Sequence, residues 1–109
     1  MITFDDLFAV VQSTGLPCYN TRVARGDDVA PPFVIVTKSG GSNDGADDVV
    51  WAHTVEYDVD LYSEVRDYEN EAAITDALDA AGIWWTDGGL WEIQTEGLVE
   101  AVFTVPVRE

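Results

Sequence analysis

Three carboxylates in one alternating segment are the first residues whose types and spacing could do chemistry. Glu56, Asp58 and Asp60 alternate with Tyr57 and Val59, so in a β-strand they share one face at intervals of about 6.5–7 Å. Paired carboxylates at such separations serve in glycoside hydrolysis. That reaction also needs a sugar-sized cleft in which one acid is desolvated, and a domain this small seldom forms one. We therefore do not expect the three acids to form a catalytic pair.

The only histidine and the only cysteine offer little to a catalyst. His53 lies in the apolar phase of its strand, and the sequence pattern gives it no nucleophile or acid as a neighbour. Cys18 would need nearby positive charge to become a reactive thiolate, but the chain has only 5 Lys and Arg. We predict that both residues are structural and that the protein is not an enzyme.

The sequence also has few residues that could bind a metal ion or a cofactor. One His and one Cys exclude a disulfide framework, a Cys-rich zinc site and any site that needs two imidazoles. The acidic segment from Asn43 to Asp48 lacks the alternating ligands and closing Glu of a calcium loop. We expect Asp44, Asp47 and Asp48 to be solvated, and we expect no metal and no cofactor.

The net charge of the chain limits the kinds of partner that it can bind. Its 109 residues include 21 Asp and Glu, giving a formal charge of -16. Proteins that track phosphates need a basic surface, so nucleic-acid binding and adsorption to anionic membranes are both disfavoured. Hydrophobic residues make up 47% and aromatic residues 11%, which indicates a folded core in a single domain over residues 1–109.

The amino terminus and the hydropathy of the chain indicate where the protein is found. The first residues lack the basic start and apolar stretch of a signal peptide, and no apolar run approaches the roughly 20 residues that span a bilayer. We expect the protein to be made and assembled in the cytoplasm, without contact with a membrane.

Two amphipathic helices are predicted. Phe4, Leu7, Phe8 and Val11 form an apolar stripe of helical period that follows a possible cap at Thr3. The second helix runs from an N-cap at Asp67 to a stop at Gly82. Its apolar stripe consists of Ile74, Ala77, Leu78 and Ala81.

The remaining segments predict strands. Residues 18–23 are a plausible strand, and the apolar run 33–36 suits a central strand covered on both faces. Residues 39–48 are typical of an exposed loop, and 49–61 alternate as a long strand. Strands over 83–86 and 90–94 flank a predicted hairpin turn, Asp87-Gly88-Gly89, and a last strand follows Gly97. The order is α-β-β-β-α-β-β-β, an α+β fold with a mainly antiparallel sheet and two helices packed on it.

Adjacent Trp84 and Trp85 add a candidate contact. On a strand their side chains point to opposite faces, so at least one of them leaves a one-sided core. A tryptophan on the second face of the sheet fits a protein–protein interface, a core covered by a helix, or a ligand cage. Interface and helix-covered core are the favoured alternatives.

Several segments together resemble one family over nearly the whole chain. These segments are the early helix ending in Thr14-Gly15-Leu16-Pro17, Pro31-Pro32-Phe33, the Asn-Asp-Gly-Ala-Asp loop at 43–47, residues 55–63, and the helix from Asp67 to Gly82 followed by Ile83-Trp84-Trp85. They resemble the tail completion, or tail terminator, proteins encoded in the head–tail joining region of siphophages and prophages of Gram-positive bacteria.

The resemblance implies a structural role in the virion. Tail terminators have a sheet flanked by helices and assemble as a hexameric ring on the tail tube, where they stop tube polymerisation and dock the head connector. The implied partners are therefore further copies of the chain, the tail tube protein and the head–tail connector protein, with DNA passing through unbound. The strong acidity of this chain departs from the family.

The acidic residues lead to a hypothesis within that role. Glu56, Asp58 and Asp60, or Asp44, Asp47 and Asp48, face either the lumen of the ring, where they repel DNA, or a basic partner ring. Two alternatives stay open. One is another neck ring, a head–tail connector or stopper, and the other is an acidic inhibitor that mimics DNA.

Overall fold

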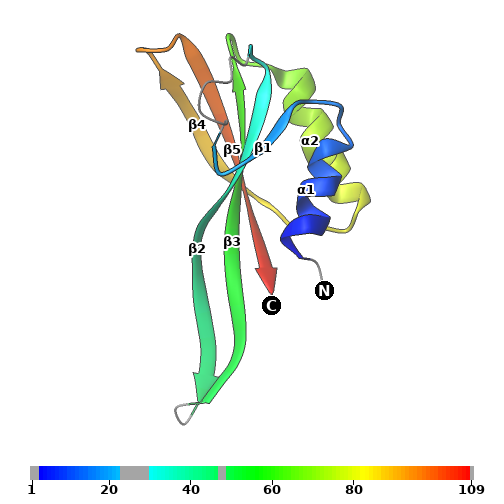
Figure 1. Cartoon of the computed structure of the whole chain (residues 1–109), viewed down its shortest axis with the longest axis vertical. Coiled ribbons are helices and arrows are strands. Elements are labelled where there is room, and N and C mark those ends of the chain that lie inside the picture. The colour runs from blue at the N-terminus through cyan, green and yellow to red at the C-terminus, as the bar shows by residue number, and fades with distance from the viewer. Residues whose placement is uncertain (1–2, 23–29, 47–48, 109) are drawn as a thin grey trace.

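A five-stranded sheet with both helices on one face forms the protein (Figure 1). The computed structural model describes residues 3–22, 30–46 and 49–108, with the side chains of 41–54 and 108 excepted. The strand order is β1-β2-β3-β5-β4, in which β1 and β2 are parallel and all other neighbours are antiparallel. The predicted α+β class is confirmed. The elements are α1 (Phe4–Gln12), β1 (Cys18–Asn20), β2 (Phe33–Ala46), β3 (Val49–Ser63), α2 (Tyr68–Ala80), β4 (Thr86–Ile93) and β5 (Leu98–Arg108).

The helix ends follow the predicted signals. Thr3 Oγ1 accepts a hydrogen bond from the Asp6 N–H at 3.2 Å, and the Asp6 carboxylate accepts one from the Thr3 N–H at 3.0 Å, which together form a capping box. Asp67 caps α2 by accepting from the Asn70 N–H at 3.1 Å. At the other end, Gly82 has a φ of 71°, and the Ile83 N–H reaches the Leu78 carbonyl oxygen at 2.9 Å.

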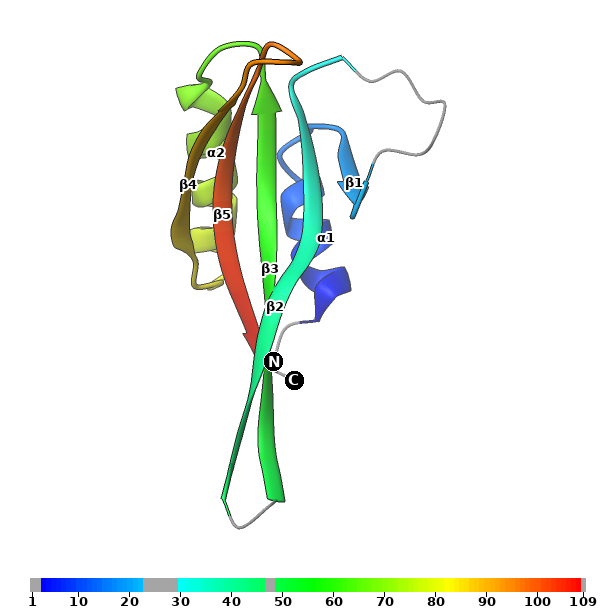
Figure 2. The ribbon, with the colours of Figure 1, turned by 90° about the vertical axis from the view of Figure 1, so that its left-hand side faces the viewer.

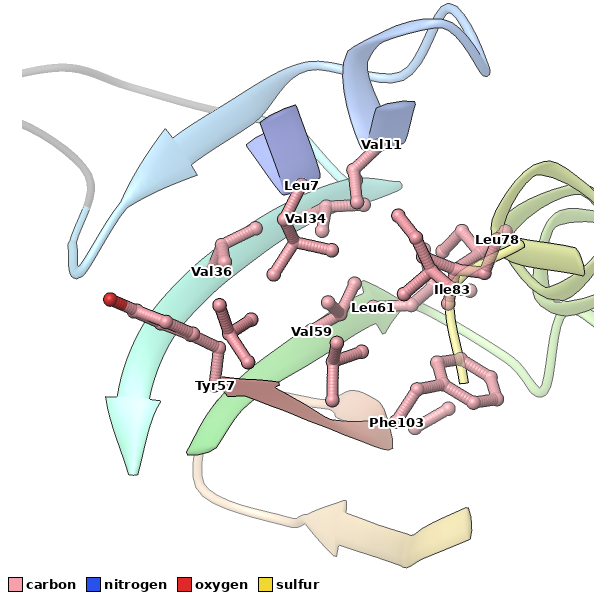
Figure 3. Close-up of a cluster of buried hydrophobic side chains, with 14 residues drawn as sticks. Leu7, Val11, Val34, Val36, Tyr57, Val59, Leu61, Leu78, Ile83 and Phe103 are labelled. Atoms are coloured by element: carbon pink, nitrogen blue, oxygen red, sulfur yellow. The ribbon is translucent and has the colours of Figure 1, made fainter. Parts of the chain in front are cut away.

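The core lies between the helices and the sheet (Figure 3). Leu7 and Val11 of α1 and Ile74 and Leu78 of α2 are almost fully buried, each on the stripe predicted for its helix. Alternate residues of the three central strands β2, β3 and β5 point into this core, so one face of these strands is buried. The sheet members are Val34, Val36, Tyr57, Val59, Leu61, Ala101, Phe103, Val105 and Val107.

The hairpin of β2 and β3 is longer than the sequence predicts. Residues 39–46, predicted as a loop, belong to β2, which pairs with β3 as far as Ala46 opposite Val49. The loop prediction is wrong because strand pairing joins backbone groups and does not require side chains that pack a core. In the described residues β5 pairs with β3 only as far as Thr54, so the two strands project beyond the sheet (Figures 1 and 2). We call residues 41–46 and 49–53 the arm.

The predicted hairpin turn at residues 87–89 is also wrong. Thr86 to Ile93 form one strand, and the pairing register with β5 shifts between Asp87 and Gly89. The Asp87 carboxylate accepts the Gly89 N–H at 2.9 Å, so the polar turn signal produces a bulge and leaves the strand direction unchanged. Residues 83–85 lie outside the strands. The chain therefore has one strand fewer after α2 than predicted.

The helices are short. No helix in the described part of the chain is long and apolar enough to cross a membrane.

Candidate interaction surface

One face of the sheet has no helix over it in the described part of the chain. Figure 2 looks onto this face, with both helices behind the sheet. Because side chains alternate along a strand, the residues between the core positions point here. We call this surface the open face; its residues are Tyr19, Phe33, Ile35, Thr37, Glu56, Asp58, Asp60, Tyr62, Trp91, Glu100, Val102 and Thr104.

Aromatic side chains gather at the end of the open face near β1. The rings of Phe33 and Tyr62 stack with centroids 5.1 Å apart, and Tyr19 meets Phe33 edge-on at 6.4 Å. Phe33 is buried although no helix covers it. The sequence prediction that β2 is covered on both faces is therefore corrected, because on this side neighbouring aromatic rings of the sheet supply the cover.

Asp60 lies at the centre of the open face. Its cross-strand neighbours are Ile35 on β2 and Val102 on β5, both apolar. Among the described residues its Oδ1 atom is buried and has no hydrogen-bond partner. Burial, together with the charges of Glu100 and Asp58, raises the pKa of Asp60 to about 7. The open face thus holds a carboxyl that is half protonated near neutral pH.

The polar side chains near Asp60, unlike its Oδ1 atom, have hydrogen-bond partners. Thr104 donates a hydrogen bond from Oγ1 to Asp58 Oδ1 at 3.0 Å across the strands. Burial raises the pKa of the Tyr62 hydroxyl, and so do its hydrogen bond with Glu100 and the charge of that carboxylate. Both pairs hold acidic groups in place on a surface that carries no Lys or Arg among its described side chains.

The structure brings together three of the residues predicted from sequence. Glu56, Asp58 and Asp60 share the open face, as their alternation predicts. They differ in environment, since Glu56 is exposed and Asp60 is half-buried.

The two tryptophans lie elsewhere, between the end of α2 and the start of β4. Trp85 turns inward, donates from Nε1 to Asp79 at 2.9 Å, and meets the Phe103 ring edge-on at 5.7 Å. Trp84 is 68% exposed. The prediction that one of the pair leaves the core is confirmed, although neither residue is in a strand.

Asp44 is the one residue of the second predicted acidic group that lies among the described residues. Asp44 lies on β2 in the arm, opposite Ala52 on β3, away from the open-face acids. Asp47 and Asp48 lie outside the described residues. The arm also contains His53, opposite Asn43.

Sequence reasoning missed the aromatic part of the open face and Glu100. The signal was present in β2, where Phe33 and Ile35 alternate with the core residues Val34 and Val36. A continuous apolar run hides this alternation, because both faces of the strand carry apolar residues. Only the pairing register shows that Tyr19, Phe33 and Tyr62 meet.

Features expected of a catalytic or metal site are weak in the described residues. The Cys18 thiol donates to the Leu16 carbonyl oxygen at 3.2 Å, and burial raises its pKa, which opposes thiolate formation. Among the side chains that the structure describes, no three from His, Cys, Asp or Glu are grouped to hold a metal ion.

Comparison with known proteins supports the fold. No protein-family model matches the sequence, and no curated protein matches it. The structure is similar to a chain in the virion of a native gene transfer agent (GTA) particle, with a TM-score of 0.58. The match covers 94% of this chain and 84% of that one at 13% sequence identity, so it shows a shared fold.

Proposed function

We propose that this protein is a structural subunit of a phage-type virion. The observation that carries the proposal is the fold shared, over nearly the whole of this chain, with a chain of the gene transfer agent virion. A sheet with one uncovered face supports it, because subunits of an assembly keep such surfaces for their neighbours. No catalytic role is proposed, since the function requires only surfaces that fit together.

Within the virion, we propose the role of tail terminator, a ring that ends tail-tube polymerisation and docks the head connector. The resemblance to the tail terminator family implies that the ring has six copies. The segments that resemble that family span α1 to the start of β4, which is most of the sheet and both helices. A closed ring forms when two different surfaces of each subunit meet head to tail. A ring of this kind would contact the tail tube protein on one side and the connector on the other.

The open face gives the acidic residues a function in this ring. Glu56, Asp58 and Glu100 lie together on a surface without a described cation. We propose that this surface faces the channel, where fixed negative charge keeps DNA from adhering during passage. The alternative is that the open face contacts a partner ring with a basic surface.

The test of the tail terminator role combines mass measurement with electron microscopy. Purified protein is mixed with tail tubes of the phage or prophage that encodes it, and the tube ends are imaged by negative stain. We expect a ring at the tube end and tubes of fixed length. Rings found only on portal-side complexes would support a connector or stopper, and inhibition of a DNA-binding enzyme by the protein alone would support a DNA mimic.

A Glu56→Lys variant tests whether the open face lines the channel or contacts a basic partner ring. Glu56 is exposed, so the substitution leaves the core intact. If the face lines the channel, tube ends are capped normally but DNA delivery and infectivity fall. If it meets a basic partner ring, the loss is already visible in capping or head joining. Asp76→Lys, at an exposed position of α2, is the matched control.

A further inference from the structure

A hollow lies where the chain leaves α2 and turns towards β4 (Figure 1). Its volume is about 380 Å³. We call it the indole hollow; its lining residues are Asp79, Gly82, Ile83, Trp84 and Trp85. Two of these residues are tryptophans, and one is a carboxylate in the last turn of α2. The hollow therefore combines aromatic surface with negative charge.

The two tryptophans of the hollow differ in how they are held. Trp85 is fixed, because its Nε1 donates to Asp79 Oδ1 at 2.9 Å and its ring meets Phe103 edge-on at 5.7 Å. Trp84 is 68% exposed, and its side chain has no ring contact or hydrogen bond with another described residue. The Trp84 ring is thus available for contact with another molecule.

The end of α2 is negative and has no cation beside it. The last carbonyl groups of a helix carry partial negative charge, so Lys and Arg are favourable near a helix C-terminus. α2 has no basic residue in its last turn and places Asp79 there instead. None of the described Lys and Arg side chains lines the hollow. A cation bound in the hollow would stabilise both the helix end and the carboxylate.

We propose that the indole hollow binds an arginine side chain of a different, basic protein. A guanidinium is a planar cation that stacks on an indole and donates hydrogen bonds to a carboxylate. Trp84 offers the ring, and Asp79 offers Oδ2, which accepts no hydrogen bond from a described residue. A second copy of the chain is disfavoured as the donor, because each copy has a formal charge of -16. The inference goes beyond the proposed function, since it assigns a binding site without requiring a ring.

Nuclear magnetic resonance of the indole N–H groups tests the site. N-acetylarginine amide is titrated into the full chain, and N-acetylcitrulline amide, which has nearly the same shape without the charge, is the control probe. We expect the arginine probe to shift the Trp84 and Trp85 signals saturably and to bind about fivefold or more tightly than the citrulline probe. Asp79→Asn keeps an oxygen for the Trp85 N–H and should weaken arginine binding by a similar factor. Asp76→Asn, at an exposed position of the same helix, should leave it unchanged.

Other results of the titration overturn the inference. Equal binding of the two probes would show that the hollow does not recognise charge. Shifts that do not saturate, or that are equally reduced by Asp76→Asn, would indicate general attraction to an acidic surface. Absence of any shift of the two indole signals would show that the hollow is not an arginine site, and tighter binding of N-acetyllysine amide would assign it to a different cation.

Attachment to partners gives a second readout. Asp79→Asn and Trp84→Ala are mixed with tail tubes and with the head connector, and the bound protein is measured by co-sedimentation. We expect both variants to bind one of these partners about fivefold or more weakly than wild type, with unchanged self-association and an intact fold by circular dichroism. Loss of self-association instead would place the arginine on a second copy, and wild-type attachment to both partners would also contradict the proposal. If the wild-type protein attaches to neither partner, the proposed function fails, and the titration with the arginine probe still decides the site.

Discussion

Asp60 lies between Ile35 and Val102 on the neighbouring strands, where its ionised form is poorly solvated. The unfolded chain gives this side chain its ordinary pKa of 3.8, whereas in the fold it rises to about 7. Between these two pH values the folded state binds more protons than the unfolded state, so stability falls as pH rises through the window. Above pH 7 Asp60 is ionised in both states, and the full cost of burying its charge lowers the stability of the fold.

Asp60→Asn should therefore stabilise the protein at pH 8. The amide keeps the shape of the carboxyl without its charge, and we expect a gain of about 1–2 kcal/mol, reduced from the full shift because water partly screens the group. The gain should shrink towards zero as pH falls to 4. Urea unfolding of both proteins across this range measures it.

A control separates Asp60 from the general acidity of the chain. Asp76→Asn removes one negative charge from an exposed position of α2. It should change stability by less than about 0.5 kcal/mol at any pH. If Asp60→Asn and wild type have parallel pH profiles, Asp60 is not desolvated in the fold.

Gly88 is required by close packing of β4 on β5. A Cβ added there would lie 2.7 Å from Val102 Cγ1 and 2.9 Å from Thr104 Oγ1, and Val102 is buried and β-branched. Gly88→Ala should destabilise the fold by about 1–3 kcal/mol. Gly40→Ala is the control, since its nearest contact would be Glu56 Oε2 at 3.9 Å. Thermal unfolding compares the two, and an equal effect would refute the packing argument.

At the level of elements, the helices were the most predictable part of the fold. Their caps, apolar stripes and stops are local signals that act within one turn, and Thr3, Asp67 and Gly82 all take the predicted positions. Local signals failed where a strand partner decided the outcome. Residues 39–46 and 87–89 carry loop and turn residues, yet pairing with β3 and β5 makes both segments parts of strands.

The candidate site was predictable to a similar degree. The period of two placed Glu56, Asp58 and Asp60 on one face, which the structure confirms. It could not show that Asp60 lies between apolar neighbours, because those neighbours come from β2 and β5 and depend on register. For the same reason the stack of Phe33 on Tyr62 was beyond prediction.

The cap of α2 provides a prediction at this scale. Asp67 accepts hydrogen bonds from the Asn70 N–H at 3.1 Å and from the Asn70 side-chain amide at 2.6 Å. Asp67→Ala should cost about 1 kcal/mol of unfolding free energy, because the first turn loses its acceptor. Asp76→Ala removes the same charge from the same helix without a cap and should be nearly neutral. Equal losses in denaturant melts would mean that the cap contributes nothing.

For the whole molecule, the distribution of surfaces determines how copies can meet. The helices close one face of the sheet, and the open face concentrates acids. Two open faces placed against each other would set carboxylates against carboxylates. In the proposed ring, copies that meet through other surfaces leave the open face available for the channel.

Salt dependence tests this balance between repulsion and contact. Each copy carries a formal charge of -16, and at 0.01 M salt the field of that charge extends about 30 Å, against about 10 Å at 0.1 M. Long-range repulsion between copies is therefore weaker at the higher salt, and self-association into the proposed ring should strengthen at least severalfold over this interval. Sedimentation at fixed protein concentration measures the change. Weaker association at the higher salt would mean that charge attraction dominates the contact between copies, and would contradict this prediction.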